Sequence, residues 1–240
     1  MNHIIRKGAV IAASMALLPF VAATSVKAQI IENDQSQAGG VYTVNTTNDL
    51  LLNATPIASL GDPTAGGGDS GAAISYLTDG LTIGSNVGAG SAAGGNGGGL
   101  TSLTYSLGSN ATGYNISNID TYSGWGDGGR FQQSYTVLYS TAAAPSTFLT
   151  LYTVNPYGPF GSNQAYIDLS SSTGPLASNV ADIQFQFNTT ANGWTGYQEL
   201  GVTGLAAATV STPEPSTWAM MLSGLGLLAL VLKTRRNRVG

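Results

Sequence analysis

The chain has 240 residues, a formal net charge of −4, 8% charged residues, no cysteine and one histidine. Without cysteine, no disulfide can stabilise the fold and no thiol can act as a nucleophile. A single histidine near the N-terminus gives no basis for a Ser-His-Asp triad or a His/Cys zinc site, so the composition excludes most hydrolase chemistry.

Residues 1–28 are typical of a secretory signal peptide. Arg6 and Lys7 precede an uncharged run over 8–25, and residues 26–28 (Val-Lys-Ala) fit the small-x-small rule for cleavage. The modest length of the run argues against the alternative, an N-terminal membrane anchor. We therefore expect export through the Sec translocon and removal of this segment.

The remaining body, about residues 29 to 212, is strongly acidic. It contains one cation, Arg130, and eleven carboxylates, which gives a net charge of −10. Such a surface repels nucleic acid and anionic lipid, and it can attract calcium. The segment 68–71 (Gly-Asp-Ser-Gly) looks like the nucleophile segment of chymotrypsin-type proteases, but His3 leaves with the signal peptide and no base remains. We expect no catalytic residues; paired carboxylates of a glycan-active enzyme are the alternative.

The body predicts an all-β fold, an antiparallel β-sandwich or jelly roll over 29–205. Ile183, Phe185 and Phe187 alternate with glutamines, the period of a strand with one buried face. No amphipathic helix is evident. Segments rich in β-branched and aromatic residues predict eight strands, at 41–44, 102–107, 114–122, 134–141, 147–154, 164–169, 180–187 and 197–203.

Two stretches of the body lack such patterns. The run 84–99 consists almost entirely of Gly, Ala, Ser and Asn, which cannot bury enough apolar surface to become ordered. We expect it to be a flexible loop. Residues 206–212 predict a short linker to the C-terminal tail.

The tail, residues 213–240, combines three features in order. A Pro-Glu-Pro motif precedes an uncharged stretch, which covers about 22 Å as a helix against a bilayer core of about 30 Å. The stretch therefore predicts a weak transmembrane segment over 218–232, with its basic end in the cytoplasm and the body outside the inner membrane. The motif is Pro213, Glu214 and Pro215, and the basic end is Lys233, Arg235, Arg236 and Arg238.

These residues, Ser211 to Arg238, resemble the PEP-CTERM sorting tail. The resemblance implies processing by an exosortase at or near Pro-Glu-Pro in Gram-negative bacteria that make exopolysaccharide, with final location at the cell surface or in the extracellular matrix. The same tail is also labelled an ice-binding protein C-terminal domain, a label that is no evidence of ice binding. The alternative is an ordinary tail anchor.

Three segments of the body, 73–80, 116–140 and 192–204, resemble in order the galactose-binding jelly roll of discoidin-type domains and many carbohydrate-binding modules. The chain departs from that pattern in lacking a disulfide and in its long Gly-rich loop. The resemblance implies a structural calcium near Asp79 and Glu199, whose carboxylates suit this ion. In the alternative interpretation Asp79 serves its own turn and Glu199 is an exposed strand residue.

A sugar site is predicted in the loop between Tyr122 and Arg130, within the second of these segments. Trp125, Asp127 and Arg130 offer a ring face for sugar C–H groups and charges for the hydroxyls, with Trp194 nearby. The structural alternative is that a tryptophan plugs one end of the sandwich while Arg130 pairs with an acid. We expect a non-enzymatic surface or matrix protein that binds exopolysaccharide; the alternative is a structural or adhesive matrix component without a ligand site.

Overall fold

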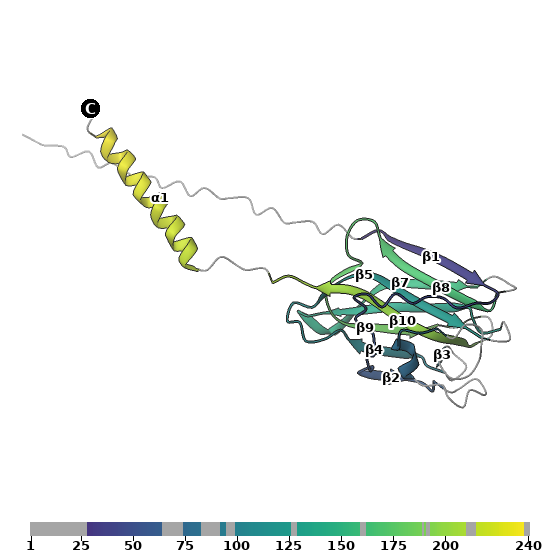
Figure 1. The fold of residues 1–240 in the computed structure, drawn as a ribbon. Coiled ribbons are helices and arrows are strands. Elements are labelled where there is room, and N and C mark those ends of the chain that lie inside the picture. Colours follow the sequence, from purple (N-terminus) through teal and green to yellow (C-terminus); the bar gives the residue numbers. More distant parts are fainter. Residues whose placement is uncertain are drawn as a thin grey trace, which may run out of the picture.

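The computed structural model describes residues 28–63, 74–82, 92–94, 99–125, 129–158, 162–188, 190, 193–209 and 215–237. Apart from Ala28, the predicted signal peptide lies outside the described residues. The described chain forms a β domain followed by a helix (Figure 1). The prediction of an antiparallel all-β domain with a C-terminal helix is therefore confirmed.

Ten strands, one short 3-10 helix and one α-helix make up the described fold. The strands are β1 (Ile30–Gln37), β2 (Ala58–Leu60), β3 (Ala92–Gly94), β4 (Ser102–Ser106), β5 (Tyr114–Gly124), β6 (Gln133–Thr141), β7 (Ala144–Tyr157), β8 (Gln164–Ser171), β9 (Ala177–Phe187) and β10 (Thr195–Ala206). The helices are η1 (Ile74–Thr78) and α1 (Pro215–Arg236).

The strands divide into two antiparallel halves of a sandwich. One half has the order β1-β8-β5-β10-β3, and the other has the order β2-β4-β9-β6-β7. The halves are joined where Tyr114 and Ile116 of β5 pair with Val180 and Ala177 of β9. A bulge at this junction bends β5 between the two halves.

The core lies between the halves and follows the predicted alternation. Ile183, Phe185 and Phe187 of β9 are buried, and the intervening Gln184 and Gln186 are not. Residues of both halves belong to one apolar cluster, for example Tyr105, Val137 and Phe185 on one side and Ile119, Ile167 and Leu200 on the other. Burial of this cluster supplies the main stabilisation, since the chain has no cysteine.

The structure differs from the prediction in several places along the β domain. Seven of the eight predicted strands form, with shifted ends, but residues 41–44 are not a strand. Within the predicted Gly-rich loop, residues 92–94 form β3, which pairs with β10. The predicted linker begins inside β10, and Ala207 is buried where its N–H donates to the carbonyl of Gly113.

A segment before β2 covers the outer face of β5 and β10. The N–H of Leu50 donates to the carbonyl of Val202, and Asp49 Oδ1 accepts from the N–H of Val202 at 3.0 Å. Tyr42 lies against Tyr122 and Tyr166, with ring centroids 6.0 and 5.6 Å away. The cover buries polar side chains that a plain two-layer sandwich would leave in water.

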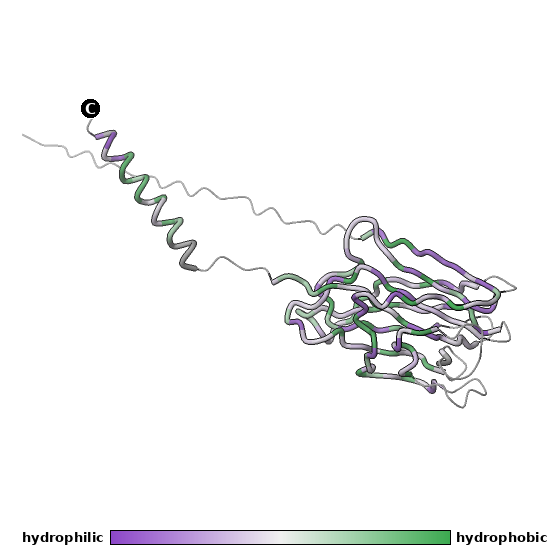
Figure 2. The backbone as a smooth tube through the Cα atoms, viewed as in Figure 1, coloured by the Kyte–Doolittle hydropathy of each residue, from purple (hydrophilic) through white to green (hydrophobic). Residues whose placement is uncertain are grey.

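The tail forms α1, which begins at Pro215, and Figure 2 shows its apolar middle and hydrophilic C-terminal end. The transmembrane segment predicted over 218–232 falls within α1. Hydropathy does not support it, because no helix in the described part of the chain is long and apolar enough to cross a membrane. Ser223, Gly224 and Gly226 dilute the apolar stretch, and the basic cluster closes it.

Candidate functional site

The sandwich has two distinct ends. At the loop end, β5, β7 and β9 finish and β6, β8 and β10 begin, so the described residues of the intervening connections, among them 129–132, 162–163 and 193–194, lie together. At the opposite end, here the tail end, the chain enters β1 at Ile30 and leaves β10 at Ala206. The strand β10 separates the two ends by about 35 Å at the usual rise per residue.

Hydrogen bonds hold the loop-end connections to one another. The N–H of Trp125 donates to the carbonyl of Asn163 at 3.0 Å, and the N–H of Gly196 donates to the carbonyl of Arg130 at 2.7 Å. The first bond places the predicted ligand residue Trp125 beside the start of β8, and the second places Arg130 beside the start of β10. The structure therefore brings together residues that are far apart in the sequence.

Trp125 is largely buried, with 7% of its surface exposed. The guanidinium carbon of Arg130 lies 4.8 Å from the centre of its ring, which is a cation–π contact. A Cβ on Gly196 would come within 2.3 Å of Trp125 Cε3, so β10 packs directly against the indole. The ring has little open area for a sugar, and its geometry matches the structural alternative in which a tryptophan plugs one end.

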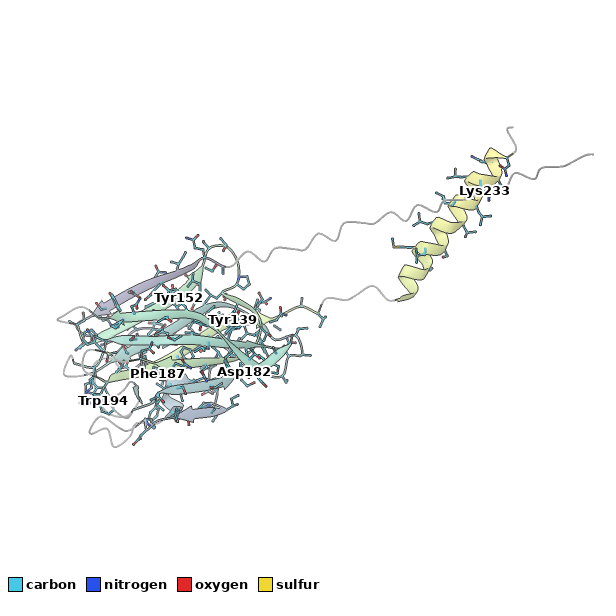
Figure 3. The ribbon with its side chains drawn as sticks, turned by 180° about the vertical axis from the view of Figure 1, so that it is seen from behind. Tyr139, Tyr152, Asp182, Phe187, Trp194 and Lys233 are labelled. Carbon is cyan, nitrogen blue, oxygen red and sulfur yellow. The ribbon has the colours of Figure 1, made fainter. Side chains whose placement is uncertain are left out.

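Trp194 is the more accessible tryptophan of the loop end. It is half-buried and lies at the end of the domain remote from the C-terminal end of β10 (Figure 3). The hydroxyl of Thr190 donates to the Trp194 carbonyl at 3.1 Å, and the N–H of Gly193 donates to the carbonyl of Thr190, which closes a tight turn. Asp127 lies outside the described residues.

The two predicted calcium ligands, Asp79 and Glu199, lie together on the outer face of β10. Their side chains are within hydrogen-bonding reach. Glu199 Oε2 accepts from the N–H of Gly80 at 3.1 Å, and Asp79 Oδ1 accepts from the N–H of Leu81 at 2.9 Å. Asp79 thus also serves its turn, as the alternative expected. Glu199 is fully buried, so the expectation of an exposed strand residue is wrong.

Glu199 sits in an unusual electrostatic environment. Its Oε1 is buried without a hydrogen-bond partner in the described part of the chain. Burial raises the pKa of Glu199 to about 9, with the charges of Asp79 and Asp49 acting in the same direction. A carboxyl in this position is either protonated or compensated by a cation.

Asp49 is a further member of this carboxylate group that sequence reasoning did not single out. Its Oδ1 accepts from the N–H groups of Leu51 and Val202, while its Oδ2 is buried with no partner among the described residues. Only the chain fold brings Asp49 to β10, so no local pattern could have indicated it. Across the described residues, no three or more His, Cys, Asp or Glu side chains form an arrangement that could hold a metal ion.

The sorting tail is only partly described. Pro215 begins α1, and Lys233 and Arg235 are exposed on its last turns. Pro213, Glu214 and Arg238 lie outside the described residues, and for Arg236 only the backbone is described.

Residues 211–236 match the family model described as the PEP-CTERM protein-sorting motif. The resemblance of the tail is thereby confirmed, and the motif indicates an exported protein that is sorted to the cell envelope. No curated protein matches the chain.

Solved structures similar to the chain include three domains. The CBM32-1 from a family 31 glycoside hydrolase of Clostridium perfringens has a TM-score of 0.32 at 8% identity, covering 42% of this chain and 68% of its own. Chitosan-binding module 1 of a chitosanase/glucanase from Paenibacillus sp. IK-5 has a TM-score of 0.40 at 18% identity, covering 65% and 98%. The C-terminal domain of a chitobiase from Bacteroides fragilis has a TM-score of 0.38 at 12% identity, covering 70% and 100%.

Proposed function

We propose that the chain is a non-enzymatic surface or matrix protein, sorted by an exosortase, whose jelly-roll domain binds exopolysaccharide at its loop end. The observation that carries this proposal is the placement of Arg130 and the half-buried Trp194 on neighbouring connections of the loop end. Sugars bind by ring stacking and by hydrogen bonds to charged groups, and this end offers both.

The position of the two chain ends supports the same function. The chain enters at Ile30 and leaves at Ala206, both at the tail end. A domain held through its C-terminal tail therefore keeps the loop end free to reach material away from the attachment point. We infer that the binding surface faces the matrix.

Trp125 has a supporting role in this proposal. Because the Arg130 guanidinium lies over its ring, Trp125 fixes the position of the only cation in the body. Trp194 then provides the aromatic ring on which a sugar stacks. The sequence alone predicted that role for Trp125, with Trp194 nearby.

The test is retention of the exported protein on immobilised exopolysaccharide from a producing strain. Trp194→Ala and Arg130→Ala should each weaken retention about tenfold, which corresponds to about 1.4 kcal/mol. Tyr114→Ala, a half-buried aromatic at the tail end of β5, is the matched control and should bind like the unmodified protein. Unchanged retention in both loop-end variants would remove the proposed site.

The experiment also separates the alternatives. A structural or adhesive component predicts no saturable retention in any variant. A glycan-active enzyme predicts release of cleaved sugar that disappears when a carboxylate pair is neutralised.

We further propose that calcium neutralises the buried Glu199 together with the half-buried Asp79. The Oε1 of Glu199 has no hydrogen-bond partner among the described residues and burial raises the pKa of this carboxyl to about 9, and both observations support this proposal. Carboxylate oxygens are ligands that calcium prefers, and backbone carbonyls would complete its coordination. Bound calcium would join the turn at Asp79 to β10 and so stabilise the covering segment.

A further inference from the structure

Four strands of the sandwich pair on one side only in the described part of the chain: β1, β2, β3 and β7. An unpaired edge exposes N–H and C=O groups that can pair with another chain, and proteins guard such edges with charges or by keeping the strands short. Three of the four edges follow this rule. Glu32 and Asp34 protect β1, while β2 and β3 have three residues each.

The fourth edge, β7, is neither short nor charged; its prolines, Pro145 and Pro156, lie near its two ends, and bulges interrupt its pairing with β6. It runs for 14 residues and contains no charged side chain. Its central part, Thr147–Thr153, reads Thr-Phe-Leu-Thr-Leu-Tyr-Thr, a proline-free run of residues that favour strands. Among the described strands only β6 pairs with β7, which leaves the outer edge open.

A cavity lies between this edge and the start of β1. This cavity, of about 500 Å³, is lined by Leu149 and Leu151 of β7, Ile30 of β1 and Leu176, among others. Leu149, which lines this cavity, is 48% exposed. Further along β7, Tyr152 hydrogen-bonds Glu32 of β1, so side chains rather than backbone pairing connect the two edges.

We propose that β7 is a homodimer interface, in which β7 of one copy pairs antiparallel with β7 of a second copy. The pairing would join the β2-β4-β9-β6-β7 halves of two molecules into one continuous sheet. Two identical antiparallel strands are related by a two-fold axis, so the assembly closes at two copies and does not grow into a fibre.

Charge favours a second copy at this edge. The body has a net charge of −10, so two copies repel each other over most of their surfaces. β7 itself carries no charge, while the acids of β1, Glu32 and Asp34, lie beside it at Tyr152; the run of threonines and apolar residues is complementary to itself. The interface does not involve Arg130 or Trp194, so it is independent of the polysaccharide site.

The first test is the oligomeric state of the full chain by sedimentation velocity. We expect dimers in the unmodified chain and at least tenfold weaker association in Leu149→Lys, because a lysine on the edge would be desolvated and repelled by its symmetry mate. Ile31→Lys is the matched control, since Ile31 is 39% exposed on the edge strand β1, and it should stay dimeric. Circular dichroism and melting temperature check that each variant is folded.

Two results would overturn the proposal: an unmodified chain that is monomeric at about 100 μM, or equal association in both lysine variants. The tail is the same in all of these proteins. Association through α1 would therefore appear as equal dimerisation of every variant.

A second test uses the absence of native cysteine. Cysteines placed singly at Thr147, Thr150 and Thr153 of β7 should give a disulfide-linked dimer under mild oxidation at the position nearest the two-fold axis, where the two Cα atoms come within bonding distance. The control, Asn33→Cys on β1, should not cross-link. Cross-linking through β1 but not β7, or through neither strand, would contradict a β7 interface.

Discussion

Asp120 shows how the covering segment changes a single residue. The carboxyl is 5% exposed on the outer face of β5, and the hydroxyl of Tyr166 donates to its Oδ1 at 2.7 Å. Burial raises the pKa of Asp120 to about 6, although the Tyr166 hydrogen bond acts in the opposite direction. The charged form is therefore less stable in the folded chain than in the unfolded chain.

This shift predicts a stability that falls with rising pH. Between about pH 4 and 6 the folded state holds a proton that the unfolded state releases, so the free energy of unfolding should decrease by about 1–3 kcal/mol across that window. Denaturant unfolding at several pH values measures the slope. Asp120→Asn should flatten this slope relative to the unmodified chain, and an unchanged slope in the variant would contradict the assignment.

Glu199 gives a second prediction at the residue scale, on calcium. Calcium should raise the melting temperature of the chain, and a chelator should reverse the rise, because the ion compensates a buried carboxylate. Glu199→Gln should remove most of the calcium effect while leaving a folded protein. Asp34→Asn, an exposed acid on β1, should retain the effect. Identical melting temperatures with calcium and with chelator would count against the site.

At the scale of elements, the close contact of β10 with the loop end is set by Gly196. A Cβ there would meet both Trp125 Cε3 at 2.3 Å and the Gly124 carbonyl oxygen at 2.6 Å. The carbonyl oxygen belongs to the backbone, so no side-chain rotation can relieve that contact. We expect Gly196→Ala to destabilise the fold by about 1–3 kcal/mol through overpacking.

The corresponding measurement is denaturant unfolding combined with polysaccharide retention. The displaced Trp125 should carry Arg130 with it, so retention should fall as well. Gly39→Ala is the control, because a Cβ on Gly39 meets no atom within 4 Å. A stable Gly196→Ala variant with full retention would show that this packing does not position the site.

The strands that sequence reasoning predicted are those with an apolar face toward the core, such as β6 and β9. β1 was missed because its side chains are polar beyond Ile31 and its order comes from pairing with β8. β3 was missed because Gly and Ala carry no pattern, and only its register with β10 fixes it. Residues 41–44 have strand-like composition, yet Tyr42 packs by its ring and not through a ladder.

The candidate site was predictable only in part, because a local pattern identifies residue types and does not identify contacts between distant segments. The residue types at Asp79 and Glu199 follow a recognisable pattern, and the structure brings the two side chains together. The full burial of Glu199 and the approach of Asp49 depend on contacts between distant segments, which no local pattern encodes. Trp125 and Trp194 have the same chemistry in the sequence, and only their burial separates a packing role from an accessible one.

At the scale of the whole molecule, charge and sorting act together. All cations except Arg130 lie in the two termini, and the acidic body lies between them. The PEP-CTERM motif at 211–236 indicates export and sorting. The loop end of the domain lies opposite the tail end, where the chain leaves β10 toward that motif. We infer that both cationic termini are removed or left behind when the body reaches its destination.

The mass of the mature protein, taken from an exosortase-containing host, tests this account most directly. The account predicts a chain that begins at Gln29 and ends at or near Pro213–Pro215, before the apolar part of α1. A full chain from Met1 to Gly240, recovered from the cytoplasm, would contradict it.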